Sequence, residues 1–171
     1  MTAVGHAWVF GDDVDTDSLA PGAFMKGPIE DLAAHCLESL DPNFAAGVTP
    51  GDVLVAGRNF GMGSSREQAV EALKRLGVAG VVARSFAGIF YRNAINLGLP
   101  VLVSPDPVSV AAGDDVSLDV RGARLVNRSR DTVVALEPLP DFLLALLSDG
   151  GLVPHLERKL AARRKPEETL P

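Results

Sequence analysis

The sequence is poor in cysteine, histidine and aromatic residues. Its 171 residues include one cysteine, Cys36, three histidines and only 5% aromatic residues. A single cysteine forms no internal disulfide, and by itself it cannot ligate a zinc ion or an iron–sulfur cluster, which take about three or four ligands. We therefore expect a mainly aliphatic core, and any metal cluster must come from another chain.

Long apolar runs and clustered positive charge are scarce as well. No apolar run approaches the ~18 residues of a membrane span, and the N-terminus lacks the basic and apolar regions of a signal peptide. The formal net charge is −6, whereas nucleic-acid and anionic-membrane partners require clustered basic residues. We expect a cytoplasmic protein that binds neither nucleic acid nor membrane.

Apolar periodicity predicts an alternation of strands and helices. The predicted strands are residues 7–10, 52–56, 78–83 and 99–103, and the predicted helices are residues 30–40, 65–76 and 87–97. The last three of these strands and the two helices between them read as a βαβαβ unit with parallel strands and right-handed crossovers. The fold class predicted is therefore α/β.

Beyond residue 104 the pattern changes. Residues 116–120 and 123–126 alternate apolar and polar side chains around a Gly-containing turn, which predicts a hairpin. Two short helices, near residues 143–147 and 152–160, close the chain. No linker divides the sequence, so we expect one domain over residues 1–171, with residues 158–171 as a basic tail.

The richest segment is residues 59–67, Asn-Phe-Gly-Met-Gly-Ser-Ser-Arg-Glu, between a predicted strand and a predicted helix. Free N–H groups at a helix start favour a carboxylate or phosphate, and Arg66 can hold a carboxylate bidentately. Ser64 and Glu67 also fit a capping box, in which each side chain satisfies a backbone N–H. The cap leaves Ser65 and Arg66 unexplained, and one corner can serve both purposes.

Three alternating carboxylates, Asp13, Asp15 and Asp17, suggest a calcium loop, but the spacing does not fit one. Counted from Asp13, an EF-hand requires glycine at the sixth position and glutamate at the twelfth, where this chain has Ser18 and Phe24. We predict no metal site here, and carboxylates that order the loop by accepting backbone N–H bonds.

Other readings of the glycine-rich turn are weaker. The serines lack the G-x-S-x-G elbow of α/β-hydrolases, which argues against a serine hydrolase. Gly61-x-Gly63 lacks the third glycine of the dinucleotide fingerprint, because Arg66 stands at that position. A non-catalytic regulatory module that merely binds an anion at this corner remains an alternative.

Five segments in the same order resemble the small subunit of 3-isopropylmalate dehydratase and its homoaconitase relatives, within the aconitase superfamily. They are residues 11–17 (GDDVDTD), 41–44 (DPNF), 50–52 (PGD), 59–67 (NFGMGSSRE) and 85–100 (SFAGIFYRNAINLGLP). The resemblance covers most of residues 8 to 153. It implies a single swivelling domain of the β/β/α type, like the last domain of aconitase, packed against a separate large subunit that carries a [4Fe-4S] cluster.

The resemblance also implies a hydro-lyase that is active only with this large subunit, as a heterodimer. The reaction would isomerise a 2-hydroxy diacid by dehydration and rehydration through a cis-alkene, as 3-isopropylmalate dehydratase does in leucine biosynthesis. Homoaconitase, or another alkylmalate or 2-methylmalate hydratase, is the alternative. The substrate would be a small di- or tricarboxylate, and this chain alone would bind no cofactor.

Carried over by position, the resemblance makes Ser64 the base that removes the proton alpha to a carboxylate. Gly63, Ser65 and Arg66 would bind substrate. The loop-ordering residues would be those at positions 15 to 17: Asp15, Thr16 and Asp17.

A second segment, Phe24, Met25 and Lys26, would contact the variable substituent of the substrate. Here the chain departs from the usual pattern, because Ala23 stands where relatives usually have arginine. Gln68 and Met62 also replace a common histidine and a frequent cysteine near the serines. An apolar pair suits an alkyl group, and a lysine suits a further carboxylate.

Overall fold

The computed structural model describes residues 3–164, which form helices and one mixed sheet of seven strands in the order β4-β3-β2-β1-β5-β6-β7. The strands are β1 (Gly5–Val9), β2 (Val53–Ala56), β3 (Gly80–Ala83), β4 (Val101–Val103), β5 (Asp115–Asp119), β6 (Arg124–Asn127) and β7 (Thr132–Ala135). Strands β1 to β4 run parallel. Strand β5 joins β1 antiparallel and continues into β6 and β7 as an antiparallel meander.

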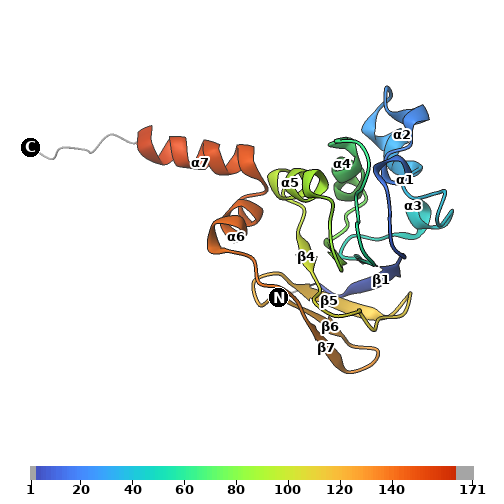
Figure 1. Cartoon of the computed structure of the whole chain (residues 1–171). Helices are drawn as coiled ribbons and strands as arrows, with labels where there is room; N and C mark the ends of the chain where they lie inside the picture. Colours follow the sequence, from blue (N-terminus) through green and yellow to red (C-terminus); the bar gives the residue numbers. More distant parts are fainter. Residues whose placement is uncertain (1–2, 165–171) are drawn as a thin grey trace, which may run out of the picture.

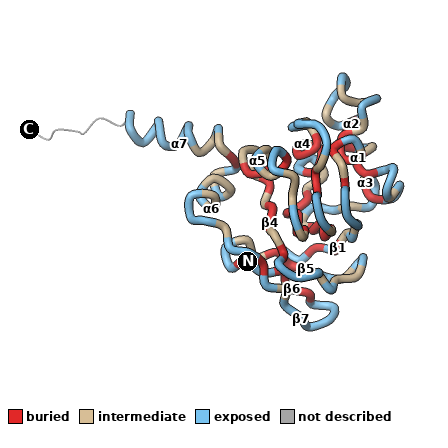
Figure 2. Tube along the Cα trace, in the orientation of Figure 1, coloured by how far each residue is buried: buried red, intermediate tan, exposed pale blue. Residues whose placement is uncertain are grey.

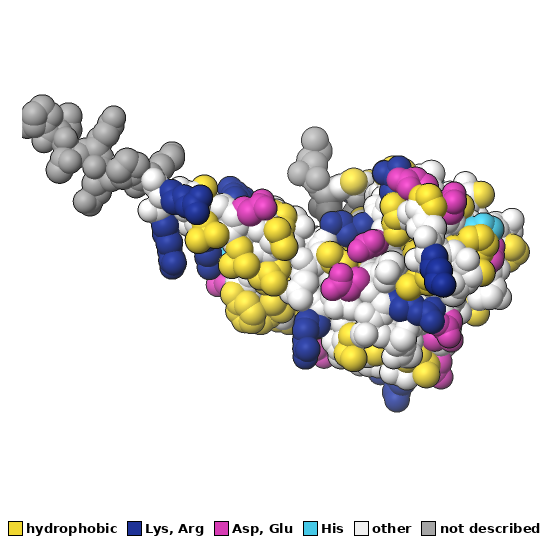
Figure 3. All heavy atoms as spheres, turned by 90° about the horizontal axis from the view of Figure 1, so that it is seen from above, with side chains coloured by type: hydrophobic (Ala, Val, Ile, Leu, Met, Phe, Trp, Pro, Cys, Tyr) yellow, Lys and Arg dark blue, Asp and Glu magenta, His cyan; other side chains and the backbone are white. Residues whose placement is uncertain are grey.

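Helices cover one face of the parallel strands, while β5, β6 and β7 curl away below them (Figure 1). The helices are α1 (Thr16–Leu19), the 3₁₀ turn η1 (Gly22–Phe24), α2 (Ile29–Ala34), α3 (Phe44–Gly47), α4 (Gln68–Arg75), α5 (Gly88–Asn96), α6 (Asp141–Ser148) and α7 (Leu152–Arg164). Helix α7 extends away from the body. Apolar side chains gather on the outer surface of α6 and α7 (Figure 3), among them Phe142 and Val153.

The core lies on both faces of the parallel strands (Figure 2). Leu54 and Val81 face the helices, where they join Phe44 and Leu73. Val53 faces the curled antiparallel strands on the other side. Because both faces are covered, β2 is a continuous apolar run rather than an alternating one.

The α/β class, the βαβαβ unit formed by β2, α4, β3, α5 and β4, and the C-terminal hairpin are confirmed. The helix predicted over residues 30–40 is too long, since α2 ends at Ala34. Leu37 adopts a left-handed backbone (φ 59°), and its N–H donates to the Ser18 carbonyl at 2.7 Å. The apolar stripe therefore continues through Cys36 and Leu37 as buried turns that are not helical, whereas Leu40 is exposed.

Two further boundaries differ from the prediction. Strand β7 was not predicted, because this edge strand is largely exposed and lacks a regular apolar alternation. Within the predicted basic tail, α7 continues through Arg164, so the basic residues from 158 to 164 lie in the last turns of a helix. Residues 165–171 of the predicted tail lie outside the described residues.

Candidate functional site

The Gly-Ser-Ser-Arg segment lies at the edge of the sheet where the parallel strands end. It follows β2 and is held between the loops that follow β1 and β3. The Gly61 N–H donates to the Val14 carbonyl at 2.7 Å, and the Phe60 N–H donates to the Ser85 carbonyl at 3.0 Å. Isolated bridges pair Asp15 with Met62 and Phe60 with Phe86. The backbone of the turn is therefore fixed from both sides by neighbouring chain segments.

Ser64 is exposed and bonds to Thr16 through both its backbone and its side chain. The Ser64 N–H donates to Thr16 Oγ1 at 3.1 Å, and the two hydroxyl oxygens lie 3.2 Å apart. Thr16 is buried, and its own N–H donates to the Met62 carbonyl at 2.8 Å. Gly63 lies close to the same hydroxyl, because a Cβ at that position would be 3.0 Å from Thr16 Oγ1. Thr16 therefore positions the serine hydroxyl.

Arg66 is held by the α1 segment. Its Nη1 donates to the Ala20 carbonyl at 3.0 Å and pairs with Asp17 Oδ1 at 2.5 Å. Its side chain is 27% exposed. Ser65 is exposed, and its carbonyl accepts a 3.4 Å bond from the Asn93 side-chain amide on α5. The two serines and the arginine are thus presented from one turn, with the guanidinium oriented by neighbouring acceptors.

The capping box, which the sequence offered as an alternative role for Ser64 and Glu67, does not form. Helix α4 begins at Gln68, and the residue before it, Glu67, already has α-helical backbone angles and makes no side-chain capping bond. Ser64 bonds to Thr16 instead, since the loop after β1 brings a buried hydroxyl within reach. Both serines consequently precede the helix rather than occupying its first turn.

The three alternating carboxylates bind different partners. Asp15 Oδ1 accepts the Ser18 N–H at 2.8 Å and caps α1, while Asp17 pairs with Arg66. Asp13 Oδ1 accepts a 3.1 Å bond from the Asn59 side chain. Within residues 3–164, no group of three or more His, Cys, Asp or Glu side chains is arranged to hold a metal ion.

Cys36 does not offer a ligand either. The thiol is fully buried in the helix-side core, and burial raises its pKa to about 12. A thiol acts as a metal ligand or nucleophile in its thiolate form, which burial disfavours strongly. The described residues of this chain therefore do not fit an iron–sulfur cluster of their own.

The segment Phe24, Met25 and Lys26 lies at η1, after the strand-edge loop. The Phe24 ring stacks on His35, with centroids 3.7 Å apart, and Met25 packs against the helix-side core. Lys26 is exposed. Among the described residues, no hydrogen bond or ion pair joins these three side chains to the Ser64–Arg66 turn.

Sequence reasoning missed two contacts of the site, the Thr16–Ser64 hydroxyl pair and the Asn93 bond to Ser65. The sequence did contain a signal for the contact between Thr16 and Ser64. Parallel strands place the loops after their carboxyl ends at one edge, so pairing β1 with β2 brings the loop at residues 11–17 to the serines. The second depends on the position of α5, which the pattern alone does not determine.

None of the helices within residues 3–164 is both long enough and apolar enough to cross a membrane.

Comparison with known proteins gives consistent results. The Aconitase C-terminal domain family matches residues 41–106. The 3-isopropylmalate dehydratase small subunit 2 of Archaeoglobus fulgidus is 47% identical, over 92% of this chain and 96% of that protein. The methanogen homoaconitase small subunit of Methanothermobacter thermautotrophicus is 49% identical, over 88% of each chain.

The fold agrees as well. The crystal structure of 3-isopropylmalate dehydratase from Methanocaldococcus jannaschii superimposes with a TM-score of 0.89 at 43% identity, covering 97% of this chain and all of the other. Sequence and fold are thus shared along nearly the whole length. The chain belongs to the family of 3-isopropylmalate dehydratase and homoaconitase small subunits.

Proposed function

We propose that this chain is the small subunit of a hydro-lyase, 3-isopropylmalate dehydratase, and that it supplies Ser64, Ser65 and Arg66 to an active site completed by a large subunit. The observation that carries the proposal is the exposed Ser64 hydroxyl, 3.2 Å from the Thr16 hydroxyl and on the same turn as the oriented guanidinium of Arg66. The names of the relatives support the subunit role.

In this proposal Ser64 Oγ takes the proton from the carbon alpha to a substrate carboxylate. The hydroxyl group on the neighbouring carbon leaves as the cis-alkene forms, and the cluster of the large subunit would supply the Lewis acid that accepts it. Addition of water in the other orientation completes the isomerisation. A serine hydroxyl is a weak base, so Ser64 would act as its alkoxide, which nearby hydrogen-bond donors stabilise and which becomes the neutral hydroxyl when it takes the proton. Thr16 Oγ1 already accepts the Ser64 N–H, which leaves the Thr16 hydroxyl hydrogen free to donate to Ser64 Oγ.

Arg66 binds the substrate carboxylate in this proposal. Ala20 and Asp17 engage one terminal nitrogen of the guanidinium, Nη1. A guanidinium carries five N–H donors in a planar fork, so donors remain for a bidentate bond to a carboxylate. The exposed Ser65 hydroxyl and the glycine at position 63, which lets a ligand approach the backbone closely, complete the binding surface.

The proposed function also requires a large subunit that carries the iron–sulfur cluster. Because the described residues of this chain do not fit an iron–sulfur cluster, we place the [4Fe-4S] cluster implied by the family on the large subunit. We further propose that the chain acts as one swivelling domain, since a single sheet joins both halves of the described chain.

A second candidate function is that of a homoaconitase small subunit. It is favoured by the exposed cation of Lys26 next to the apolar Phe24 and Met25, a composition suited to a substituent that ends in a carboxylate. The identity to the methanogen homoaconitase small subunit, 49%, lies within the range of 43 to 52% found for dehydratase small subunits.

The test is reconstitution with the large subunit under anaerobic conditions, followed by hydration assays with alkylmaleates and cis-homoaconitate. Ser64→Ala should lower kcat roughly 10²- to 10⁴-fold, the usual contribution of a general base, while the complex still forms by size-exclusion chromatography. Ser148→Ala, an exposed serine on α6, is the matched control and should retain full activity. An intact Ser64→Ala complex with near-normal kcat would overturn the role of Ser64.

A further inference from the structure

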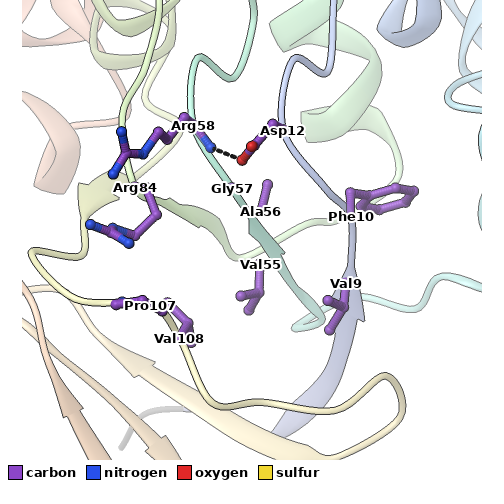
Figure 4. A pocket seen from close by; sticks show the side chains of 10 residues that line it. All are labelled: Val9, Phe10, Asp12, Val55, Ala56, Gly57, Arg58, Arg84, Pro107 and Val108. Atoms are coloured by element: carbon purple, nitrogen blue, oxygen red, sulfur yellow. Dashed lines mark hydrogen bonds between the residues drawn. The ribbon is translucent and has the colours of Figure 1, made fainter.

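A separate hollow lies at the same edge of the sheet, beside β1 and β2 and below the Arg58 and Asp12 loops (Figure 4). Its volume is about 310 Å³, and the segment at Pro107 and Val108 forms one of its walls. No residue from Gly63 to Arg66 lines it. It is therefore a different cavity from the serine site, and its size suits a small ligand.

One carboxylate and two guanidinium groups surround this hollow. The Arg58 N–H donates to Asp12 Oδ1 at 2.6 Å, which fixes the carboxylate, and Asp12 Oδ2 has no hydrogen-bond partner among the described residues. Gly57 makes this arrangement possible, because a Cβ at that position would lie 1.9 Å from Asp12 Oδ1. The acid is thus held in place with one oxygen available.

Arg58 and Arg84 line the hollow with Asp12, and Figure 4 shows their guanidinium groups on the opposite side from the carboxylate. Within residues 3–164 neither arginine side chain makes an ion pair. The Arg84 Nη2 donates to the Pro105 carbonyl at 3.3 Å, but its Nε is buried without any acceptor. A buried donor without a partner is costly, and an incoming carboxylate would satisfy it.

The rest of the lining is apolar. Val9, which is 41% exposed, and the buried Val55 extend along the strands beneath the charged groups, and Pro107 and Val108 close the wall beside them. The hollow thus has opposite charges on two sides and an apolar surface beneath them. A zwitterion with a small aliphatic side chain matches this arrangement. A plain carboxylate would leave the free oxygen of Asp12 unpaired, and a dicarboxylate would be repelled by it.

We propose that this hollow binds an α-amino acid with a small aliphatic side chain. The carboxylate of the ligand bonds to Arg84 and Arg58, its ammonium group bonds to Asp12 Oδ2, and its side chain covers Val9 and Val55. The inference does not depend on the proposed hydro-lyase function, because no residue assigned to the serine site lines the hollow.

The test is calorimetric titration of the full chain with three matched probes. L-valine carries both charges, 3-methylbutanoate lacks the ammonium group, and isobutylamine lacks the carboxylate. We expect L-valine to bind and each truncated probe to bind roughly tenfold more weakly or worse, since each leaves a charged group unpaired. Equal affinity for L-valine and 3-methylbutanoate, or no binding of L-valine up to its solubility limit, would overturn the proposal.

Variants locate the site. Arg84→Gln and Arg58→Gln should each weaken L-valine binding, whereas Arg121→Gln, an exposed arginine in the β5–β6 turn, should not. Asp12→Asn keeps an oxygen that can accept the Arg58 N–H, so it should fold normally and reduce the preference for L-valine over 3-methylbutanoate. Unchanged affinity in both arginine variants, with thermal unfolding like that of the parent chain, would place the ligand elsewhere.

Discussion

Gly61 shows how closely the serine-bearing turn packs against α5. The residue is buried and has a left-handed backbone with φ 82°. A Cβ added there would lie 2.2 Å from Phe90 Cγ and 2.4 Å from Phe90 Cβ. The second of these atoms is attached directly to the α5 backbone, so a rotamer change alone gives no relief. Either the turn or the helix must shift to accept a side chain.

We therefore predict that Gly61→Ala destabilises the chain by roughly 3 kcal/mol or more, from backbone strain and overpacking together. Because the turn carries Ser64, activity of the reconstituted complex should fall as well. Urea unfolding measures the first effect. Gly88→Ala is the control, since a Cβ at Gly88 meets nothing within 4 Å and its φ is not positive. Equal stability of the two variants would contradict the packing argument.

The residue types of the candidate site could be recognised from sequence, but their partners could not. Two serines and an arginine after a Gly-x-Gly turn indicate anion chemistry wherever the turn lies. The local rule that paired Ser64 with Glu67 failed because a tertiary partner, Thr16, replaced the local one. Local capping rules assume that no other chain segment supplies a hydrogen bond, and here the loop after β1 does.

At the scale of elements, η1 and the residues after it form a segment in which two side chains are anchored and one is free. The Phe24 ring is stacked on His35, and Met25 packs against the core. Lys26 is exposed, and no ion pair involving it is present among residues 3–164. The anchored pair fixes where the lysine begins, so its ammonium group can select a substituent without affecting the fold.

Lys26→Met should change substrate preference in the reconstituted complex. We expect kcat/KM for a carboxyalkyl substrate such as cis-homoaconitate to fall roughly tenfold relative to an alkylmaleate, because a charge partner is lost while apolar surface is kept. The measurement is the ratio of the two values. Lys159→Met, in the exposed part of α7, should leave the ratio unchanged. An equal loss on both substrates would refute a selective role for Lys26.

The elements that sequence predicted best are those buried on both faces. Strands β2 and β3 are short apolar runs, and all four residues of each are buried. Elements at the margin were harder to predict, because β7 is exposed and the segment after α2 keeps its apolar spacing as turns. Burial constrains composition strongly, whereas an exposed edge leaves composition nearly free, and apolar spacing alone does not distinguish a helix from a buried turn.

At the scale of the whole molecule, Asp52 connects β1 to the turn before β2. Its side chain is almost fully buried, with the residue 1% exposed. Its carboxylate accepts bonds from the His6 N–H at 2.8 Å and the Trp8 Nε1–H at 2.9 Å, and from the N–H and hydroxyl of Thr49 at 2.9 and 3.1 Å. A single ionised group thus fixes the first parallel strand pair, on which both the loop at residues 11–17 and the serine turn depend.

The pKa of Asp52 gives this connection a pH dependence. Burial by itself raises the pKa, but the hydrogen bonds from His6, Thr49 and Trp8 outweigh burial and hold the pKa below its usual value. An unfolded aspartate has a pKa of about 3.9. Around that pH the folded chain therefore binds fewer protons than the unfolded chain. The stabilisation is therefore complete above the unfolded pKa and is lost as the pH falls through the lower folded pKa.

Urea unfolding from neutral pH down to about pH 3 should therefore separate the parent chain from Asp52→Asn. The variant should be less stable by roughly 2 kcal/mol at neutral pH. The NH2 group of asparagine is a donor and cannot accept the hydrogen bonds that one carboxylate oxygen of Asp52 accepts. The gap between the two chains should narrow as the pH falls, since protonation removes the same stabilisation from the parent. Asp131→Asn is the control. Asp131 is exposed and has a left-handed backbone, which asparagine tolerates, so this variant should match the parent at every pH. A gap that stays constant down to the acid limit would mean that Asp52 acts through packing alone, and that its charge does not hold β1 in place.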